Sequence, residues 1–582
     1  MVLKNEQVAR ALRDIAFLTE VEDGPNAQFK ARAYYRAAGA VEGLDDDVIA
    51  VYEKGGLDAL LEIPGVGKAI AAKIEEHAKT GGIRYHEELR AKLPLDTVQL
   101  KIEGIGPKTL KAIYEKLKVT DLAGLEAAAK GGRLKTVPGI SAKKEQDIIK
   151  RIEFAKKGGW RYIIGEVWPM IKQIESRLKG LQGVTDVSVA GSVRRMKETI
   201  GDVDFLIAAS CDPEKVMDFF TAMPEVSEVK GRGPAKAFVR LRGGVDADLL
   251  VVPQRSWGSA LLYFTGSKEH GVELRRIAIA RGLRLNEWGV FKGDKPVAGR
   301  TEQDVYRALG LAWVPPEMRE NAGELELAAA TATATTKGAM PELIKYGSLK
   351  GDLQVHSDNT DGTATIEEMA LAAKEFGLDY IALTDHTKSL AMAGGLDGKE
   401  LLDQANRIWD LNDRLQGVRV LASAEVNIMK DGSLDIENNV LDKLDIVGAA
   451  IHSNFNLPME EQTGRLAQAA ENPAVDIIFH PTGRLINRRE GYPIDIAKLV
   501  ETAKVTGTAL EIDAHYNRLD LKDVYARLAV KNGVKLVIDS DAHHPLHYAF
   551  LQFGIGQARR AWATESDVLN TLPADRLLKA IK

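Results

Sequence analysis

Cysteine is almost absent from this sequence, since Cys211 is the only one among 582 residues. One cysteine excludes a disulfide framework and a zinc site built from thiolates. No stretch approaches the roughly 18 consecutive apolar residues of a membrane-spanning helix. The first residues, MVLKNEQVARALRDIAF, lack the apolar run and cleavage site of a secretory signal. We therefore expect a reduced, cytoplasmic protein without a membrane span.

A strong net charge is also absent. The chain has 78 Lys and Arg against 83 Asp and Glu, which gives a net charge of −5. That balance does not by itself indicate nucleic-acid binding, so such a function must rest on local motifs. A content of 45% hydrophobic and 28% charged residues is typical of a soluble globular protein. The length predicts about four domains.

Histidine is unevenly distributed, which divides the chain in two. Eight of the 11 histidines lie between residues 356 and 547. The Ala/Thr-rich stretch 324–340 precedes them, has no core pattern and predicts a linker. Residues 1–155 predict mainly helices, and 160–330 predict strands alternating with helices. From residue 351 onward, apolar strand-like runs alternate with helical segments, which is the rhythm of an α/β barrel.

Three glycine-containing stretches near the N-terminus are related, and each joins two predicted helices. They are LEIPGVGKAIAAKI (61–74), IEGIGPKTLKAIYEKL (102–117) and the weaker copy VPGISAKKEQDII (137–149). The glycines of the two stronger copies are Gly65, Gly67, Gly104 and Gly106. Glycine permits tight turns, and amides at the start of the next helix can hold a phosphate. The repeat predicts helix-hairpin-helix motifs that grip a DNA backbone, although one copy alone is equally consistent with a glycine-capped turn.

Lys73 lies about one and a half turns into the helix after the first hairpin. One interpretation is a solvated surface lysine. The other is an amine that attacks an abasic sugar as a Schiff-base nucleophile, which requires a lowered pKa. Lys30, Arg32 and Lys68 are the cations that could lower it, and the sequence leaves both interpretations open.

Two carboxylates, Asp202 and Asp204, begin the apolar run VDFLIA. In a strand, residues i and i+2 face the same side, so both carboxylates meet at one point. That spacing suits hard divalent cations bound through oxygen. Asp248, in the apolar strand GVDADLLVVP (244–253), could complete the cluster from a neighbouring strand. The alternative is a charged edge strand.

A turn of small residues, GSVRR, stands upstream of these carboxylates. The backbone and hydroxyl of Gly191 and Ser192 could hold a phosphate, and Arg194 and Arg195 follow as cationic partners. Three carboxylates, a phosphate turn and arginines predict phosphoryl transfer with two metal ions.

The C-terminal half repeats one pattern, because each strand-like segment ends in an imidazole or a carboxylate. The predicted metal ligands are His356, Asp361, His386, Glu425, His452, His480, Asp541 and His543. Strand ends of an α/β barrel converge on one face, which holds the active site. The mixed ligand set suits up to three Mn²⁺, Zn²⁺ or Fe²⁺ ions better than Mg²⁺ or Ca²⁺. Water bound there attacks phosphorus, so we predict phosphoester hydrolysis.

Other polar residues of this half are assigned less specific roles. Arg484 and Arg518 are candidates to hold substrate phosphate, with a surface salt bridge as the alternative. His515, His544 and His547 are predicted to be outer-shell or structural residues.

The motifs GSVRR and GDVD, followed by LLYFTGSKEHGVELR (261–275), resemble the nucleotidyltransferase palm of family X DNA polymerases, the group of DNA polymerase beta. NAQFKARAYYRAAGAV followed by IPGVGKAIAAKI is similar to the small lyase domain of that family. The resemblance covers the first 320 residues in the same order. It departs at Gly271, where polymerase beta has a base-contacting asparagine, so that contact is lost or supplied by another group.

This resemblance implies roles for individual residues. Asp202 and Asp204 would bind two Mg²⁺ or Mn²⁺ ions, and Asp248 the ion that activates the primer 3′-hydroxyl. The residues implied to bind nucleotide or DNA are Ser192, Arg195 and the Gly201 amide at the triphosphate, Tyr263, Phe264 and Gly266 at the sugar pocket, and Arg275 toward the template. Lys73 falls on the position of the lyase nucleophile, with Lys30 and Tyr34 nearby.

The C-terminal half resembles the PHP (polymerase and histidinol phosphatase) domain over residues 350–560. That domain commonly opens with His-x-His, whereas this chain has Gln354 two residues before His356. Glutamine is a poorer ligand, so one ion would be held weakly. A PHP domain behind a family X core is similar to the bacterial family X polymerase, which implies Mn²⁺-dependent 3′→5′ exonuclease activity and cleavage at abasic sites.

The expected fold is multidomain, with helical helix-hairpin-helix domains, an α+β palm and thumb, and a distorted α/β barrel at the C-terminus. The predicted domains are a lyase-like domain (1–85), a helix-hairpin-helix DNA-binding domain (86–157), the palm (158–255), the thumb (256–322), a linker (323–348) and the PHP domain (349–582).

The expected function is DNA repair in the bacterial cytoplasm, at the nucleoid, by a monomer. It would fill gaps during base excision repair, using dNTPs on gapped or nicked DNA, and would remove nucleotides from the 3′ end. Three alternatives are a PHP nuclease whose palm only positions DNA, a non-catalytic DNA-binding scaffold, and a small-molecule phosphatase. The intact carboxylates of the palm favour the polymerase.

Overall fold

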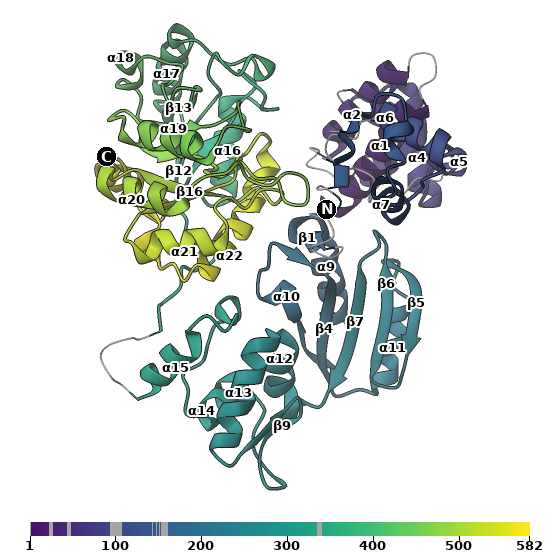
Figure 1. Ribbon diagram of the computed structural model, residues 1–582. Helices are drawn as coiled ribbons and strands as arrows, with labels where there is room; N and C mark the ends of the chain where they lie inside the picture. Colours follow the sequence, from purple (N-terminus) through teal and green to yellow (C-terminus); the bar gives the residue numbers. More distant parts are fainter. Residues whose placement is uncertain are drawn as a thin grey trace. The chain divides into compact units, whose positions relative to one another are not determined.

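The computed structural model divides the chain into two compact units (Figure 1). The first comprises Met1–Trp160 and Asn487–Arg489, and the second comprises Arg161–Ile486 and Glu490–Lys582. The structure describes residues 2–22, 27–42, 48–63, 65–93, 107–142, 144–146, 148–149, 152, 161–333 and 340–581. Each unit is described by itself.

The first unit is helical, as predicted. Its elements are α1 (Val2–Glu22), α2 (Ala27–Glu42), α3 (Val48–Leu61), α4 (Lys68–Thr80), α5 (Arg84–Lys92), α6 (Pro107–Leu117), α7 (Leu122–Lys130) and the 3-10 helix η1 (Leu134–Thr136). Leu12, Ile15 and Leu18 of α1 are fully buried in its core. Their spacing of three residues places them on one side of a helix.

The second unit begins with the palm. Its elements are β1 (Tyr162–Ile163), α9 (Ile164–Lys179), β2 (Val184–Val189), α10 (Gly191–Arg194), β3 (Thr199–Ile200), β4 (Asp202–Ala209), α11 (Pro213–Thr221), β5 (Val226–Arg232), β6 (Lys236–Leu241) and β7 (Asp246–Val252). The main sheet has the order β2-β4-β7-β6-β5, and β4 runs parallel to β7. Val203, Phe205 and Ile207 of β4 alternate along the strand and are buried beneath α9 and α11.

The thumb follows the palm. Its elements are η2 (Gln254–Ser256), α12 (Trp257–Thr265), α13 (Lys268–Ala280), β8 (Arg284–Asn286), β9 (Gly289–Lys292), β10 (Lys295–Ala298), α14 (Glu302–Ala308), η3 (Pro316–Met318) and α15 (Glu324–Ala332). The three strands form an antiparallel sheet. Leu274 of α13 and Tyr306 of α14 lie in one buried core.

α15 corrects the predicted linker, because the segment after residue 323 begins with a helix. Leu325 and Ala328 are buried in the thumb core. The Glu324 carboxylate lies 2.7 Å from Nδ1 of His270, which is 54 residues away in the sequence. The Ala/Thr run shows no apolar period, and its partners are distant in sequence, so local pattern missed this helix. Residues 334–339 of the predicted linker lie outside the described residues.

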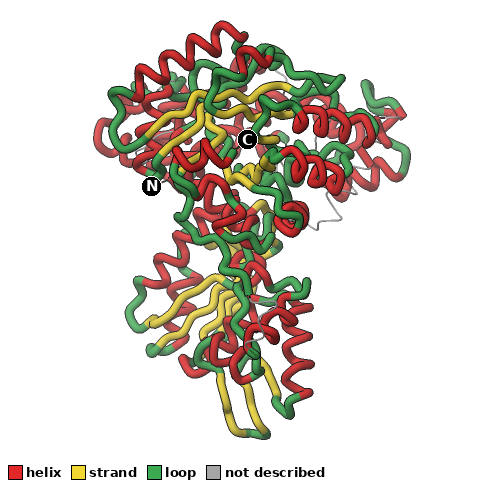
Figure 2. Tube along the Cα trace, turned by 90° about the vertical axis from the view of Figure 1, so that its left-hand side faces the viewer, coloured by secondary structure: helices red, strands yellow, loops and turns green. Residues whose placement is uncertain are grey.

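The C-terminal domain is the predicted distorted α/β barrel. Its strands are β11 (Gly351–Val355), β12 (Tyr380–Leu383), β13 (Arg419–Asn427), β14 (Ile446–Ala450), β15 (Ile477–Ile478), β16 (Ala509–Asp513) and β17 (Leu536–Asp539). Its helices are α16 (Ile366–Glu375), η4 (Ala391–Ala393), α17 (Gly398–Asn412), α18 (Asn438–Leu441), α19 (Met459–Glu471), α20 (Ile496–Thr506), α21 (Asp523–Lys531), η5 (Pro545–Phe550), α22 (Leu551–Arg560), η6 (Glu565–Asp567), η7 (Leu569–Thr571) and α23 (Ala574–Ala580). The seven strands pair in sequence order and are parallel. Strands are drawn in yellow and helices in red in Figure 2. A bridge between Val355 and Ala542 nearly closes the barrel.

The barrel and the palm share apolar contacts inside the second unit. Leu519 and Phe553 of the barrel are buried in the palm core. A Cβ at Gly165 in α9 would lie 2.2 Å from Cβ of Tyr516, so this approach requires glycine. The palm core is therefore completed by side chains of the barrel.

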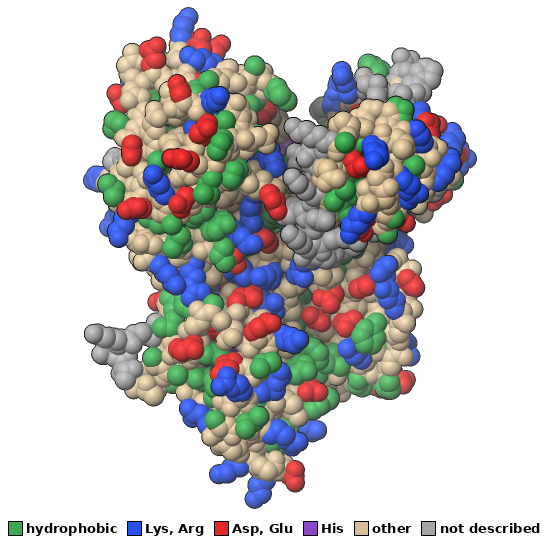
Figure 3. Space-filling model, in the orientation of Figure 1, with side chains coloured by type: hydrophobic (Ala, Val, Ile, Leu, Met, Phe, Trp, Pro, Cys, Tyr) green, Lys and Arg blue, Asp and Glu red, His purple; other side chains and the backbone are tan. Residues whose placement is uncertain are grey.

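Basic and acidic side chains are interspersed on the face drawn in Figure 3. This mixture agrees with the small net charge of the chain. Within the described ranges, no helix combines the length and apolar character required to cross a membrane.

Candidate active sites

The palm carboxylates are arranged by the parallel pairing of β4 with β7. Asp204 lies opposite Asp248, and Asp202 lies opposite Asp246. Asp246 is bound by Arg240, whose Nε lies 2.9 Å away, and by Lys230 at 2.8 Å. The structure therefore brings together Asp202, Asp204 and Asp248, and it neutralises the fourth carboxylate of this face.

The predicted cluster is electrostatically unbalanced. Burial, followed by the charges of Asp202 and Asp248, raises the pKa of Asp204 to about 7. Burial also raises the pKa of Asp248, although Lys236, with Nζ 3.6 Å from its carboxylate, acts in the opposite direction. Divalent cations among these oxygens would offset the repulsion, so the donors fit the predicted metal ions.

Gly191 allows the phosphate turn to approach these carboxylates. Its φ of +57° is in the left-handed region, and a Cβ there would lie 2.3 Å from Oδ2 of Asp204. The amide of Ala190 donates to the carbonyl of Asp204 at 2.8 Å. Ser192 is the second residue of α10, and Gly201 stands immediately before β4, so both lie next to the strand that carries Asp202 and Asp204.

The two adjacent arginines bind different carboxylates, although both also donate to Thr265. Arg194 binds Glu302 through two hydrogen bonds of 2.7 and 2.9 Å, and Glu302 also binds the fully buried Arg319. Arg194 thus links palm to thumb, which corrects its predicted role as a partner of the phosphate. Arg195 instead donates from Nε to Glu320 at 3.1 Å.

A cavity of about 320 Å³ lies beside Arg195. The predicted residues that line it are Arg195, Tyr263, Phe264, Gly266, Gly271 and Arg275. Gly266 has a φ of +70°, and a Cβ there would lie 3.1 Å from NH1 of Arg195. Gly271 stands where polymerase beta has a base-contacting asparagine. A Cβ at Gly271 would lie 3.9 Å from NH1 of Arg275, so this guanidinium is the polar group nearest to that position.

The first helix-hairpin-helix turn is formed as predicted. Gly65 has a φ of +82°, and Gly67 caps α4 in an extended conformation. Pro64 between the helices, and Gly104 and Gly106 of the second copy, lie outside the described residues.

Lys73 lies among aromatic rings. Its Nζ is 4.9 Å from the centre of the Tyr85 ring and 5.9 Å from that of Tyr34. Burial lowers the pKa of Lys73, against the opposing charges of nearby glutamates. The lowered pKa of Lys73 is therefore due to burial and not, as the sequence had led us to expect, to neighbouring cations. Lys30, one of those cations, lies exposed on α2.

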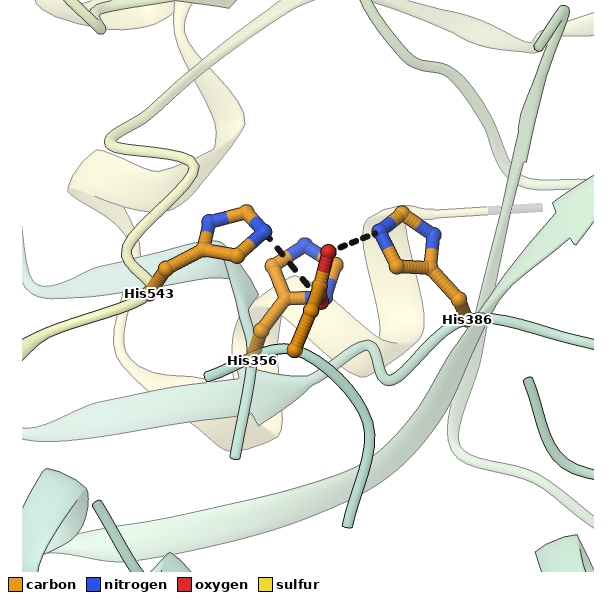
Figure 4. A group of neighbouring side chains, drawn as sticks. His356, His386 and His543 are labelled. Atoms are coloured by element: carbon orange, nitrogen blue, oxygen red, sulfur yellow. Dashed lines mark ion pairs between the residues drawn. The ribbon is translucent and has the colours of Figure 1, made fainter. Parts of the chain in front are cut away.

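All eight predicted metal ligands of the barrel lie in one network of contacts. Figure 4 shows the imidazoles of His356, His386 and His543 turned toward one another. Asp361 contacts His386 at 3.5 Å and His543 at 3.4 Å. The remaining ion pairs are those of Glu425 with His386 (3.1 Å), His452 (3.2 Å), His480 (2.8 Å) and His356 (3.6 Å), and of Asp541 with His356 (3.3 Å) and His543 (3.6 Å).

These donors form two groups whose geometry could hold a metal ion. One comprises His356, Asp361, His386 and His543, and the other comprises His386, Glu425 and His452. Within the described chain, Oε2 of Glu425 and both ring nitrogens of His356 are buried without a hydrogen-bond partner. Buried imidazoles and carboxylates left in this state fit transition-metal ions.

The electrostatics of the barrel agree with a site prepared for cations. Burial would raise the pKa of Glu425, but the charges of His386 and His452 lower it well below the usual value. Burial would lower the pKa of His386, but Glu425 and Asp361 raise it to about 10. Protons therefore balance the carboxylates where metal ions would do so.

Gln354 is fully buried, and neither of its amide atoms has a partner among the described residues. Nε of Arg518 lies 3.3 Å from Asp513 and 3.6 Å from Asp541. Arg484 instead binds Glu198 of the palm at 2.8 Å. The salt-bridge alternative therefore describes Arg484, although the pair is part-buried and joins two domains.

Several supporting residues were not predicted. Oδ1 of Asn427 accepts from Nδ1 of His452 at 2.8 Å, which orients that imidazole. Asp385 accepts from the amide and hydroxyl of Ser357 at 2.7 and 2.6 Å and fixes the loop after His356. Asn427 stands two residues after Glu425 and Asp385 one residue before His386, and this adjacency to ligands was the available signal.

Two of the remaining histidines have local contacts. Nδ1 of His544 accepts from the amide of Leu546 at 3.1 Å, and His547 accepts from the amide of His543 at 3.3 Å. Burial lowers the pKa of His515 to about 4.

The fold and both sites define a nucleotidyltransferase joined to a metal-dependent phosphoesterase barrel. Family models match as a helix-hairpin-helix domain over residues 3–83, a SAM-like helix-hairpin-helix tandem over 98–153, a DNA polymerase beta thumb over 260–320 and a PHP domain over 352–577. The chain belongs to the bacterial family X DNA polymerases that carry a PHP domain, as predicted.

The chain is similar to three relatives over different parts of its length. The DNA polymerase/3′-5′ exonuclease PolX of Bacillus subtilis is 36% identical over 98% of this chain and 97% of its own length. DNA polymerase lambda of Rattus norvegicus is 27% identical over 50% of this chain and 53% of its own. A probable phosphatase of Thermoanaerobacter sp. is 34% identical over 36% of this chain and 84% of its own length.

Proposed function

We propose that this protein is a DNA polymerase of base excision repair that also removes nucleotides from the 3′ end. The observation that carries the proposal is the parallel register that sets Asp204 beside Asp248, near the cavity that Arg195 lines. The buried ligand network of the barrel supports the second activity.

The palm residues bind and orient the reactants. Asp202, Asp204 and Asp248 would hold two Mg²⁺ or Mn²⁺ ions, which would supply activation of the primer 3′-hydroxyl and balance phosphate charge. Ser192, Arg195 and the Gly201 amide hold the triphosphate. Tyr263 and Phe264, whose rings meet edge to face at 5.2 Å, form the wall of the sugar pocket. Gly266 leaves room for Arg195, and Arg275 faces the template.

The barrel residues prepare hydrolysis. The eight predicted ligands, from His356 to His543, would hold Mn²⁺, Zn²⁺ or Fe²⁺, and these ions would supply the activation of water for hydrolysis. Asn427 keeps the imidazole of His452 in place. The reaction is phosphodiester hydrolysis at a 3′ end, with abasic-site cleavage as a second use of the same centre.

The helical unit brings DNA to these sites. The turn of Gly65 and Gly67 holds a backbone phosphate, and the second hairpin, with Gly104 and Gly106, repeats the contact. Lys73, with Tyr34 and Lys30 nearby, acts as the abasic-site lyase nucleophile. The substrates are gapped or nicked DNA and dNTPs, and the enzyme works as a monomer at the nucleoid in the bacterial cytoplasm.

Primer extension across a one-nucleotide gap, run beside 3′-exonuclease assays, tests the proposal. Asp204→Ala should abolish incorporation while exonuclease activity persists, and His356→Ala with Asp541→Ala should do the reverse. Asp246→Ala is the matched control, because Asp246 faces the same side of the sheet but is bound by Arg240. Loss of both activities in both folded variants would contradict two separate sites. If Asp204→Ala still incorporated nucleotides, the result would favour the alternative in which the palm only positions DNA.

A small-molecule phosphatase remains the second candidate for the barrel, favoured by the similarity to a probable phosphatase. Release of phosphate from p-nitrophenyl phosphate, compared with release of nucleotides from a DNA oligomer, separates the two. We expect the oligomer to be the better substrate.

A further inference from the structure

Glu320 lies between an arginine of the palm and an arginine of the barrel. Its Oε1 is 3.1 Å from Nε of Arg195 and 2.9 Å from NH1 of Arg560. Lys197 approaches the same oxygen at 3.8 Å. The Glu320 carboxylate therefore connects Arg195 of the nucleotide cavity with Arg560, which lies 365 residues further along the chain.

Arg560 is held rigidly. It lies at the end of α22, its side chain is only 3% exposed, and it binds Asp523 at 2.6 and 2.9 Å. Its NH1 also donates to the backbone carbonyl of Arg195 at 2.9 Å. Arg560 thus contacts both the backbone of Arg195 and the carboxylate that binds the Arg195 side chain.

α22 is seated closely on the palm. A Cβ at Gly556 would lie 2.8 Å from Cε of Met196, and Gln557 donates to the carbonyl of Met196 at 3.4 Å. Met196 directly follows Arg195. The place of Arg560 is consequently fixed by packing as well as by its ion pairs.

The positive charge of Arg560 affects how a nucleotide would bind beside Arg195. A triphosphate approaching Arg195 must also approach Glu320, whose negative charge repels it. Arg560 offsets that charge. Without Arg560, Glu320 would bind Arg195 more strongly and repel the nucleotide more strongly.

We infer that Arg560, a residue of the barrel, is a positioning residue for nucleotide addition, because it neutralises Glu320 and fixes Arg195 in the nucleotide cavity. The inference rests on the proposed polymerase function. It makes nucleotide binding in the palm depend on a side chain of the hydrolytic domain.

Steady-state incorporation by Arg560→Met in the full chain tests this. KM for the dNTP should rise about tenfold, a size expected for residues that share one ion-pair network, while kcat changes less than about twofold. Arg559→Met is the matched control. Arg559 belongs to the same helix and forms a part-buried ion pair with Glu317 of the thumb at 2.7 Å, and within the described chain its partners do not include Arg195 or Glu320. Its KM should stay at the wild-type value.

A double variant separates charge from mere structure. In Arg560→Met with Glu320→Gln, the uncompensated carboxylate is gone, so KM should return to within about threefold of wild type. A purely structural role predicts no recovery, and that result would overturn the inference. An unchanged KM in folded Arg560→Met would overturn it as well.

Two further readouts keep the test decisive. Exonuclease activity should be equal in all variants, which reports that the barrel is folded. If Arg560→Met does not fold, Arg560→Lys replaces it; this change keeps the charge but loses one of the two contacts, so KM should rise about two- to threefold, and no rise contradicts the inference. Absence of incorporation by the wild-type protein would instead refute the proposed polymerase.

Discussion

At the scale of single residues, the palm depends on carboxylates that are unfavourable without metal ions. Asp204 is the clearest case, since burial and two neighbouring aspartates raise its pKa to about 7. The folded, metal-free protein therefore keeps a proton that the unfolded chain releases near pH 4. The stability associated with this proton is present at low pH and is lost as pH rises through 7.

Asp204→Asn should consequently stabilise the metal-free protein, and more so at high pH. Its advantage over wild type should grow by about 2–3 kcal/mol between pH 5 and pH 8. Urea unfolding in EDTA at the two pH values measures this. Asp246→Asn is the control, because Arg240 lowers the pKa of Asp246 and the variant should show no such gain. Equal advantages of Asp204→Asn at both pH values would contradict the assignment.

Gly191 gives a second prediction at this scale. Gly191→Ala should reduce incorporation by about 100-fold or more, because the new Cβ would lie 2.3 Å from Oδ2 of Asp204 and displace that carboxylate. Exonuclease activity should be unchanged. Gly293→Ala is a matched control, since Gly293 has a nearly equal φ of +59° and a Cβ there has nothing within 4 Å among the described atoms. A similar loss in both variants would point to backbone strain alone.

Sequence patterns singled out the candidate ligands, but they did not indicate which side chains bind them. The alternation in VDFLIA and the repeated strand ends of the barrel expose Asp204 or His386 because each interrupts an apolar run. Nothing similar marks Glu320, which takes its meaning from Arg560, 240 residues further along the chain. The sequence also could not predict that Arg194 and Arg195 bind different carboxylates, because both residues belong to one motif.

At the scale of elements, α15 shows how a helix with a weak pattern is fixed by tertiary contacts. His270 lies between Glu324 at 2.7 Å and the hydroxyl of Tyr306 at 2.8 Å, and both rings are buried. The amides of Asn321 and Ala322 also donate to Glu324. This network joins α15 to α13 and α14.

Glu324→Ala should destabilise the thumb by about 3–5 kcal/mol, because it leaves His270 and two amides without their acceptor. Thermal unfolding followed by circular dichroism measures the effect. Glu326→Ala in the same helix is exposed and should change stability by less than about 0.5 kcal/mol. Comparable effects of the two changes would show that α15 contributes little to the thumb.

The elements themselves were largely predictable. Fully buried strands joined by helices indicate a parallel barrel, and β11 to β17 follow that pattern in sequence order. The register of β4 against β7 was not readable from either strand alone, because it depends on pairing between residues 44 positions apart, such as Asp204 and Asp248.

At the scale of the whole molecule, the palm and the barrel are not independent globules. Phe553 of α22 is 4% exposed, lies in the palm core and meets the ring of Trp168 edge to face at 5.7 Å. Arg484 and Glu198 add a part-buried ion pair between the same domains. We therefore expect these two domains to unfold together and the helical unit of residues 1–160 to unfold separately.

Phe553→Ala should lower the stability of the shared transition by about 3–5 kcal/mol without moving that of the helical unit. Differential scanning calorimetry distinguishes the two transitions. Phe376→Ala, at a half-exposed position of the barrel, is the comparison and should cost much less. If palm and barrel melt together in wild type but separately in the Phe553 variant, the result still agrees with a shared core. An unchanged transition in the variant would contradict it.

The parallel ladder between β4 and β7 limits how this enzyme can be altered. Slipping one strand by a single residue would send Asp248 to the opposite side of the sheet, away from Asp204. Insertions and deletions are thus tolerated only in the turns outside Asp202–Ala209 and Asp246–Val252. Chimaeras that exchange segments with a distant homologue will keep catalysis only when their crossover points respect those borders.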